Sequence, residues 1–186
     1  SLQLEGEAVP VAEAVLTIQG AALGIYSASP SGVLAYHTGS VSTSVAPVWF
    51  DRDGRELGEL ADAGEYNTVA LSPDGRTAAF SVTVPTSGTF DLWTYDLERD
   101  VRTRFTFDDG MDFWPVWAPD GESLFFTSDR NGTFDIYRMG VGGVSGPEAV
   151  LASERDLTPV AVSPDGRWLA YTEQSVDTDV DIWALP

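Results

Sequence analysis

Three stretches of this chain are close variants of one another: LSPDGRTAAF (residues 71–80), WAPDGESLFF (117–126) and VSPDGRWLAY (162–171). The glycines of successive PDG triplets are 46 and 45 residues apart. A fourth, less regular variant, ASPSGVLAYHTG (28–39), places its glycine 43 residues before the next one. A repeat of this length is typical of one four-stranded β-propeller blade, so the repeats predict a propeller.

Each regular repeat carries a second landmark downstream of its PDG triplet. FDLWTYDL contains Asp91, FDIYRMGV contains Asp135, and VDIWALP contains Asp181, whereas the less regular repeat has PVWFD with Pro47 in that place. Two landmarks at near-constant spacing make a chance repetition improbable. We expect each Asp to open a third strand, where its carboxylate accepts hydrogen bonds from backbone N–H groups.

The strands follow from local chemistry. In SPDG, Pro fixes φ, Asp tolerates the next turn position and Gly supplies a positive φ, so the tetrapeptide is a turn, and the short apolar runs on both sides make it a hairpin. The strand after the turn is almost continuously apolar, which predicts cover on both of its faces. The more polar segments RELGEL, RTRFTFD and EAVLAS are typical of an outermost fourth strand.

The sequence therefore predicts an all-β fold: a β-propeller of about four four-stranded antiparallel blades in a single domain over residues 1–186. The repeats run at about residues 20–60, 61–107, 108–152 and 153–186. The last repeat stops after its third strand, so we expect an N-terminal strand at residues 1–9 to complete that blade and close the ring. The alternative is a fragment of a larger propeller, and the absence of Met before Ser1 favours an excised piece.

SDRNGTFDIYRM (128–139) and the pattern D-x-x-x-P-x-x-x-SPDG-x-x-L-A-Y resemble the WD40-like repeats of TolB-type β-propellers. The resemblance covers most of residues 20–186. The run SGVLAYHTG…PVWFDRDGRELGEL is most similar to the propellers attached to bacterial Ser/Thr kinases, and similar repeats occur in the gating propellers of prolyl-oligopeptidase-like peptidases. The resemblance implies protein–protein contact, no shared catalytic residue and a bacterial, extracytoplasmic setting. Such propellers usually have six or more blades.

The charge composition narrows the classes of partner. Asp and Glu total 29 against 10 basic residues, all of them Arg, for a formal net charge of −19. A field of this sign repels phosphate backbones, which excludes nucleic acid as the expected partner. Adaptation to high salt and ordinary acidity with an Arg-rich codon bias both account for the charge. The chain has no Cys, and no apolar run long enough to span a membrane.

Residues with catalytic chemistry are better explained as structural. His37 is the only histidine, and no G-x-S-x-G motif supplies a nucleophile for it. Asp108, Asp109 and Asp112 lie close enough in sequence to resemble the paired carboxylates of a glycosidase. The Asp residues of the repeats, however, are explained by structural roles in turns or at the starts of strands. We therefore expect no enzymatic activity and no cofactor.

A calcium site is the third chemical alternative. The segment DRDGRELGE brings Asp51, Asp53, Glu56 and Glu59 close together, but its spacing does not match an EF-hand. A hairpin turn between the third and fourth strands explains DRDG more simply. We expect no metal site.

A partner would be expected where the loops after strands two and four emerge on one end of a propeller, here called the loop face. The candidate contact residues there are aromatic, acidic or Arg side chains: Tyr66, Asp109, Asp112, Phe113, Trp114, Asp129, Arg130 and Arg155. Aromatic and Arg side chains are typical interface anchors, and a negative face suits a basic peptide or protein. The alternative for Phe113 and Trp114 is that they fill the space between blades.

The leading hypothesis is thus a non-catalytic scaffold or sensor domain that binds protein or peptide through its loop face. A second hypothesis is self-assembly, in which a homodimer builds one eight-bladed ring from two chains. A third is a hydrolase or its gating domain.

Overall fold

The computed structural model describes residues 17–18, 23–24, 26–28, 34–36, 44–142 and 145–186. Every regular element in these ranges is a β-strand, which confirms the predicted all-β class. No helix in the described ranges is long and apolar enough to cross a membrane. The predicted closing strand at residues 1–9 and His37 lie outside the described residues.

The described strands form four blades and a short ribbon of β1 (Thr17–Ile18) and β2 (Leu23–Gly24). Blade 1 contains β3 (Tyr26–Ala28), β4 (Leu34–Tyr36), β5 (Val48–Phe50) and β6 (Glu56–Glu59). Blade 2 contains β7 (Tyr66–Leu71), β8 (Thr77–Thr83), β9 (Phe90–Asp96) and β10 (Val101–Arg104). Blade 3 contains β11 (Asp112–Trp117), β12 (Ser123–Ser128), β13 (Asp135–Gly140) and β14 (Glu148–Leu151). Blade 4 contains β15 (Leu157–Val162), β16 (Leu169–Ser175) and β17 (Asp179–Leu185).

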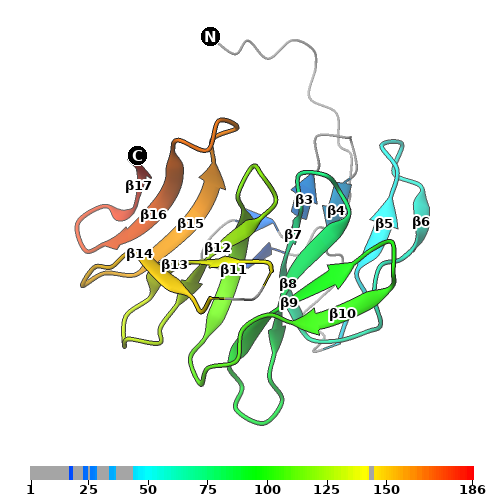
Figure 1. Cartoon of the computed structure of the whole chain (residues 1–186), viewed down its shortest axis with the longest axis horizontal. Helices are drawn as coiled ribbons and strands as arrows, with labels where there is room; N and C mark the ends of the chain where they lie inside the picture. The colour runs from blue at the N-terminus through cyan, green and yellow to red at the C-terminus, as the bar shows by residue number, and fades with distance from the viewer. Residues whose placement is uncertain (1–16, 19–22, 25, 29–33, 37–43, 143–144) are drawn as a thin grey trace.

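Each blade is an antiparallel meander whose strands pair in chain order. The first strands β3, β7, β11 and β15 contact one another in that order, so the blades stand side by side. Figure 1 shows this arrangement as a fan, from β5 and β6 at one side to β15–β17 at the other. The structure therefore shows the predicted propeller architecture.

The PDG turns are built as the sequence predicts. Gly75, Gly121 and Gly166 have φ values of 71°, 71° and 70°, which favour glycine. In the turn of blade 2, the Asp74 carboxylate accepts hydrogen bonds from Ser72 Oγ at 2.6 Å and Arg76 N at 3.0 Å. These bonds hold the pKa of Asp74 below its ordinary value. The repeated Asp is therefore a turn residue.

The DRDG segment is also a turn, between β5 and β6. The Asp51 Oδ1 atom accepts hydrogen bonds from the backbone N–H groups of Asp53 at 3.0 Å and Arg55 at 2.8 Å, and Gly54 has a φ of 79°. This geometry agrees with the hairpin interpretation of the segment.

Apolar side chains between neighbouring blades form the core. Leu92 of blade 2 packs with Leu124 and Phe126 of blade 3, and all three are fully buried. Between blades 3 and 4, Ile136 packs with Leu157 and Leu169. A similar cluster lies between blades 1 and 2. The second strands of the middle blades are thus covered on both faces, as their continuous apolar sequence predicts.

Substitution of Phe126 tests the importance of the packing between blades. Phe126 has no exposed surface, so Phe126→Ala should lower the free energy of unfolding by about 3–5 kcal/mol because it removes buried apolar area and leaves a cavity. Phe107 is 70% exposed and is the matched control, and Phe107→Ala should cost less than about 0.5 kcal/mol. Urea unfolding followed by fluorescence measures both, and equal losses would contradict this account.

Candidate functional site

Arg130 joins two loops of the loop face, the segment before β11 and the segment after β12. Its Nη2 atom lies 2.6 Å from Asp108 Oδ2 and 2.9 Å from Asp112 Oδ1, and its Nε donates to Ser128 Oγ at 2.9 Å. Its guanidinium lies over the Tyr137 ring, 4.7 Å from the centroid. With only 17% of its side chain exposed, Arg130 is a half-buried clamp that holds the two loops together.

Backbone contacts complete this clamp. The Asp129 Oδ1 atom accepts a hydrogen bond from Met111 N at 2.6 Å, and Asp108 Oδ1 accepts one from Gly110 N at 3.0 Å. A Cβ atom on Gly110 would lie 2.8 Å from Asp129 Oδ1 and 2.9 Å from Asp108 Oδ1. A larger residue would therefore force these two carboxylates to shift where the two loops meet.

Burial dominates the electrostatics of the carboxylates beneath the loops. Asp112 is fully buried and Asp91 is 2% exposed. Burial raises the pKa of Asp112, against the opposing effects of a hydrogen bond from Ser128 and the charge of Arg130. Burial likewise raises the pKa of Asp91, which is paired with Arg104 at 2.6 Å.

The three Asp residues of the second landmark make different contacts. Asp135 accepts a hydrogen bond from Ser153 N at 3.0 Å, as expected for a carboxylate that caps the backbone. Asp91 pairs with Arg104, and Asp181 accepts a hydrogen bond from Thr178 Oγ1 at 2.8 Å. The repeated position therefore keeps an Asp but changes its partner from blade to blade.

Four half-buried aromatic rings gather beside the Arg130 clamp: Phe90, Phe113, Trp114 and Phe134. The centroid of the Phe113 ring lies 4.6 Å from Trp114, 5.2 Å from Phe134 and 6.0 Å from Phe90. These rings come from β9, from β11 and from the residue before β13, so the cluster crosses from blade 2 to blade 3. We call it the aromatic cluster.

Trp114 has an unusual backbone. Its φ is 53°, in the left-handed region that a bulky residue rarely adopts. It lies at the β-bulge of β11, between Phe113 and Val116, where the pairing with β12 shifts register. Strained residues of this kind gather at functional sites, so this surface is a candidate site.

The structure brings five of the eight predicted contact residues close together on blade 3: Asp112, Phe113, Trp114, Asp129 and Arg130. Asp109 is exposed in the adjoining loop.

Tyr66 and Arg155 lie apart from this group. Arg155 forms an ion pair with Glu173 of blade 4 at 2.8 Å. Tyr66 packs on Phe80 with 8% of its surface exposed, and its hydroxyl donates to the Asp62 carbonyl at 2.9 Å.

Sequence reasoning left Phe90 and Phe134 out of the site. Both directly precede the Asp of the second landmark, in FDLW and FDIY, so the repeat alone signals that two blades present the same ring at the same end.

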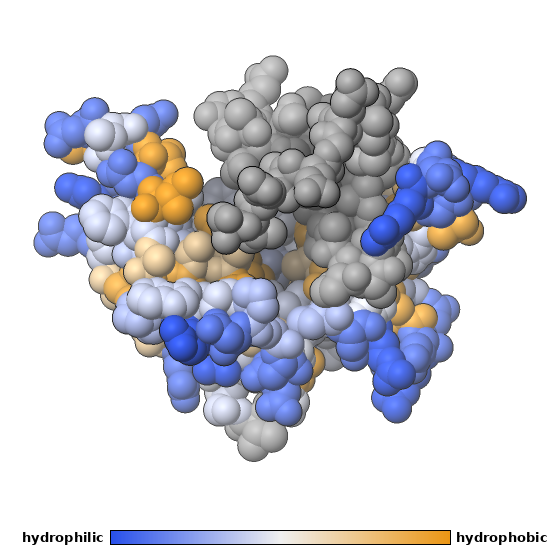
Figure 2. All heavy atoms as spheres, turned by 90° about the horizontal axis from the view of Figure 1, so that it is seen from above, coloured by the Kyte–Doolittle hydropathy of each residue, from blue (hydrophilic) through white to orange (hydrophobic). Residues whose placement is uncertain are grey.

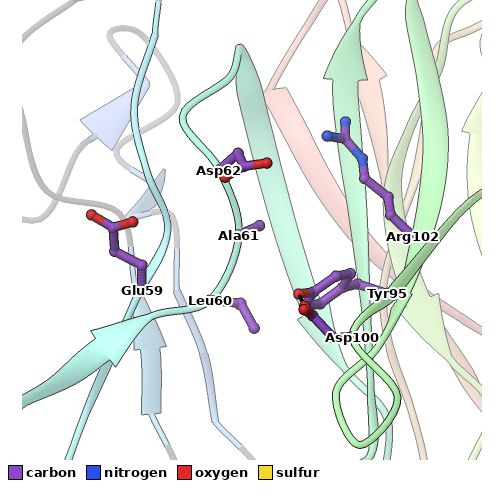
Figure 3. Close-up of a pocket in the computed structure, with 7 residues that line it drawn as sticks. All are labelled: Glu59, Leu60, Ala61, Asp62, Tyr95, Asp100 and Arg102. Carbon is purple, nitrogen blue, oxygen red and sulfur yellow. Dashed lines mark hydrogen bonds between the residues drawn. The ribbon is translucent and has the colours of Figure 1, made fainter.

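A separate pocket of about 390 Å³ opens between blades 1 and 2 (Figure 3). Three of its seven lining residues are acidic, Glu59, Asp62 and Asp100, and they lie beside Tyr95 and Arg102. The Arg102 guanidinium is held over the Trp93 ring, 4.6 Å from its centroid. Among the described residues, no three acidic or histidine side chains are grouped so as to hold a metal ion.

Comparison with known protein families identifies the repeats. Residues 54–184 match the family described as the TolB beta propeller domain. The chain is 32% identical over 109 residues to an uncharacterized protein of Agrobacterium fabrum, which covers 59% of this chain and 36% of that protein. It is also 32% identical over 72 residues to dipeptidyl-peptidase 5 of Porphyromonas gingivalis, which covers 37% of this chain and 10% of the peptidase.

Among solved structures, TolB from Acinetobacter baumannii superposes with a TM-score of 0.73 at 22% sequence identity. The match covers 86% of this chain and 40% of that chain, and at this identity it shows the fold alone. The chain thus spans about a third of the Agrobacterium relative and two fifths of TolB. The similarity to kinase-attached propellers stays a prediction.

Removal of Arg130 should be costly because it leaves Asp108 and the buried Asp112 without their cation. We expect Arg130→Ala to lower the free energy of unfolding by about 3–5 kcal/mol. Arg99 pairs with Asp96 at 3.7 Å but is 82% exposed, and Arg99→Ala should change stability by less than about 1 kcal/mol. Thermal and urea unfolding measure both variants, and a small effect at Arg130 would refute its role as a clamp.

The raised pKa of Asp112 predicts a pH dependence of stability. Unfolded Asp has a pKa of about 3.9, so the stability contributed by protonated Asp112 is complete below that pH and is lost as the pH rises through the higher folded-state pKa. Asp112→Asn removes this titration. The stability of the unsubstituted protein minus that of the variant should therefore fall as the pH rises above about 4. Urea unfolding over this pH range measures the difference, and Asp109→Asn at an exposed position is the control. A difference between the unsubstituted protein and Asp112→Asn that stays flat or rises would contradict the prediction.

Proposed function

The chain belongs to the TolB β-propeller domain family, and we propose that it is a non-catalytic module that binds a protein or peptide partner. The partner would lie on the loop face of blades 2 and 3, over the aromatic cluster and the adjoining acidic loop. The binding chemistry would be aromatic contact together with attraction between a basic partner and carboxylates.

The observation that carries this proposal is the aromatic cluster itself. Three Phe rings and Trp114 contact one another at the loop ends while each keeps part of its surface in water. Large aromatic rings contribute most to binding where they are fixed in place before the partner arrives. The left-handed backbone of Trp114 supports this role because the surrounding structure holds a strained conformation there.

The Arg130 clamp supports the proposal in a second way. A loop that orders only on binding loses conformational entropy, which weakens affinity. Here the ion pairs of Arg130 and the hydrogen bond from Met111 N to Asp129 already hold the loops. The surface would therefore be preorganised, as on other rigid scaffolds that present binding loops.

Charge favours a basic partner. The chain carries a formal net charge of −19, and Asp109 is exposed beside the aromatic cluster. The one cation of the clamp, Arg130, is already paired with Asp108 and Asp112, so it does not offset the exposed carboxylates at this end. A peptide with Arg or Lys next to an apolar side chain fits both features.

The experiment is a binding screen with an array of short peptides that differ in charge and aromatic content, followed by fluorescence anisotropy on the best binder. We expect basic peptides with an apolar residue to bind. Trp114→Asn should weaken binding at least about tenfold, because Asn tolerates the left-handed backbone but lacks the ring.

Trp168 provides the matched control. It is 45% exposed and lies between a PDG turn and the start of β16, at the opposite end of the blade from the loop face. Trp168→Asn should leave the affinity unchanged. The proposal fails if both Trp variants bind equally well, or if acidic and basic peptides bind alike.

A further inference from the structure

The pocket between blades 1 and 2 holds opposite charges that do not pair with each other. Asp62 lies on the segment after β6, and Arg102 lies on β10 of the next blade. Figure 3 shows the two side chains on opposite sides of the pocket, with Asp62 directed toward the side of Arg102. No carboxylate of the described residues lies within ion-pair distance of the Arg102 guanidinium. The two charges therefore face each other across a space that neither of them fills.

Two aromatic rings hold Arg102 in place. Its Cζ atom lies 4.6 Å from the centroid of the Trp93 ring and 5.5 Å from that of the Tyr66 ring. Its Nη1 atom also donates a long hydrogen bond to the Tyr66 hydroxyl at 3.4 Å. A guanidinium that stacks on an aromatic face keeps the N–H groups at its edge available as donors. Arg102 is thus a positioned cation that has no carboxylate partner among the described residues, which distinguishes this pocket from an ordinary acidic surface.

Carboxylates gather on the rest of the pocket wall. Asp100 accepts a hydrogen bond from the Tyr95 hydroxyl, and Glu59 is the exposed last residue of β6. The hydrogen bond to Asp100 raises the pKa of Tyr95, and the charges of Asp100 and Asp62 add to this effect. Two carboxylates from different blades therefore act on one hydroxyl. With Glu59, Asp62 and Asp100 against Arg102, the wall carries three negative charges and one positive charge.

A small ligand that matches this wall carries one carboxylate and more than one cationic group. The planar fork of a guanidinium can bind a carboxylate with two parallel hydrogen bonds, and Arg102 has the N–H groups to offer them. An ammonium group donates to carboxylates, which Asp62 and Asp100 supply. A free basic amino acid has this set of charges, with an α-carboxylate, an α-ammonium group and a cationic side chain.

Other small ligands match the wall less well. A simple anion would meet three carboxylates for one guanidinium, and a diamine would leave Arg102 unused. The pocket volume of about 390 Å³ lies in the range of small-molecule sites in proteins, roughly 300–1,000 Å³. Size and charge thus both agree with a ligand as small as an amino acid.

We propose that this pocket binds a free basic amino acid, for which lysine is the probe. The α-carboxylate of the amino acid pairs with Arg102, and its cationic groups pair with Asp62 and Asp100. The seven lining residues of the pocket belong neither to the aromatic cluster nor to the Arg130 clamp. The site is therefore separate from the loop face, and its tests do not depend on the proposed function.

The first test is isothermal titration calorimetry of the chain at low salt with lysine, cadaverine and Nα-acetyl-lysine. Cadaverine lacks the carboxylate of lysine, and Nα-acetyl-lysine lacks its α-ammonium charge. We expect lysine to bind at least about tenfold more tightly than either compound, and to bind more weakly as added salt screens the charges.

Each other result of the titration overturns a part of the proposal. No binding of lysine would refute the site. Cadaverine that binds as tightly as lysine would contradict the pairing of a carboxylate with Arg102. Nα-acetyl-lysine that binds as tightly as lysine would contradict a free amino acid and indicate the C-terminus of a peptide instead.

Arg102→Gln tests which residue recognises the carboxylate. It should weaken the binding of lysine at least about tenfold without weakening that of cadaverine, which has no group for the guanidinium. Arg76→Gln is the matched control, because Arg76 is 67% exposed and already pairs with Glu98 at 3.3 Å. It should leave the affinity for lysine unchanged. Circular dichroism checks that both variants are folded, and a folded Arg102→Gln variant that binds lysine normally would refute the assignment.

A second pair of variants tests the acidic side of the pocket. Asp62→Asn and Asp53→Asn each remove one negative charge from an exposed position of the same part of the chain, so they change the overall field alike. Asp62→Asn should weaken the binding of both lysine and cadaverine by about threefold or more, whereas Asp53→Asn, in the DRDG turn, should not. Equal effects of the two substitutions would show that lysine responds to net charge alone and would contradict a site at this pocket.

Discussion

Each middle blade of this protein is apolar on both faces, so it is stable only where a neighbouring blade excludes water from each side. Leu92 and Ile136 show the result, since both are fully buried between blades. Burial of apolar surface is the main favourable term in folding, and in a radial fold most of it comes from neighbours that are whole repeats away. The sequence reflects this need for cover on both faces, because the second strands are almost continuously apolar.

The loop face is rigid because of this packing between blades. β12 and β13 are fixed by the blades on either side, and the segments that leave them therefore emerge at set positions. Arg130 then needs only short contacts to Asp108 and Asp112 to hold the two loops together. The aromatic cluster lies on these fixed supports, which is why a surface of half-exposed rings is well placed to bind a partner. At the last described blade, no described blade packs against the second face, and Ile182 there is 79% exposed.

The sequence predicted most of what is set by local chemistry. The PDG turns and the DRDG hairpin depend on a few adjacent residues, and the structure has them where they were expected. Contacts between distant segments were harder to predict. The pairing of Asp91 with Arg104 and of Asp135 with Ser153 N depends on which side chain the next strand presents, and Tyr66 packs on Phe80 although its loop position suggested an exposed anchor. The positive φ of Trp114 arises at a bulge, and Pro115 in DFWPVW signals an irregular strand without fixing the backbone conformation of its neighbour.

The most direct test of the central claim is native-state hydrogen exchange. If cover on both faces stabilises a blade, amides of β12 and β13 should exchange much more slowly than amides of β16 and β17, whose second face lies open. Equal protection in the two pairs of strands would show that the blades do not depend on their neighbours, and would contradict this account.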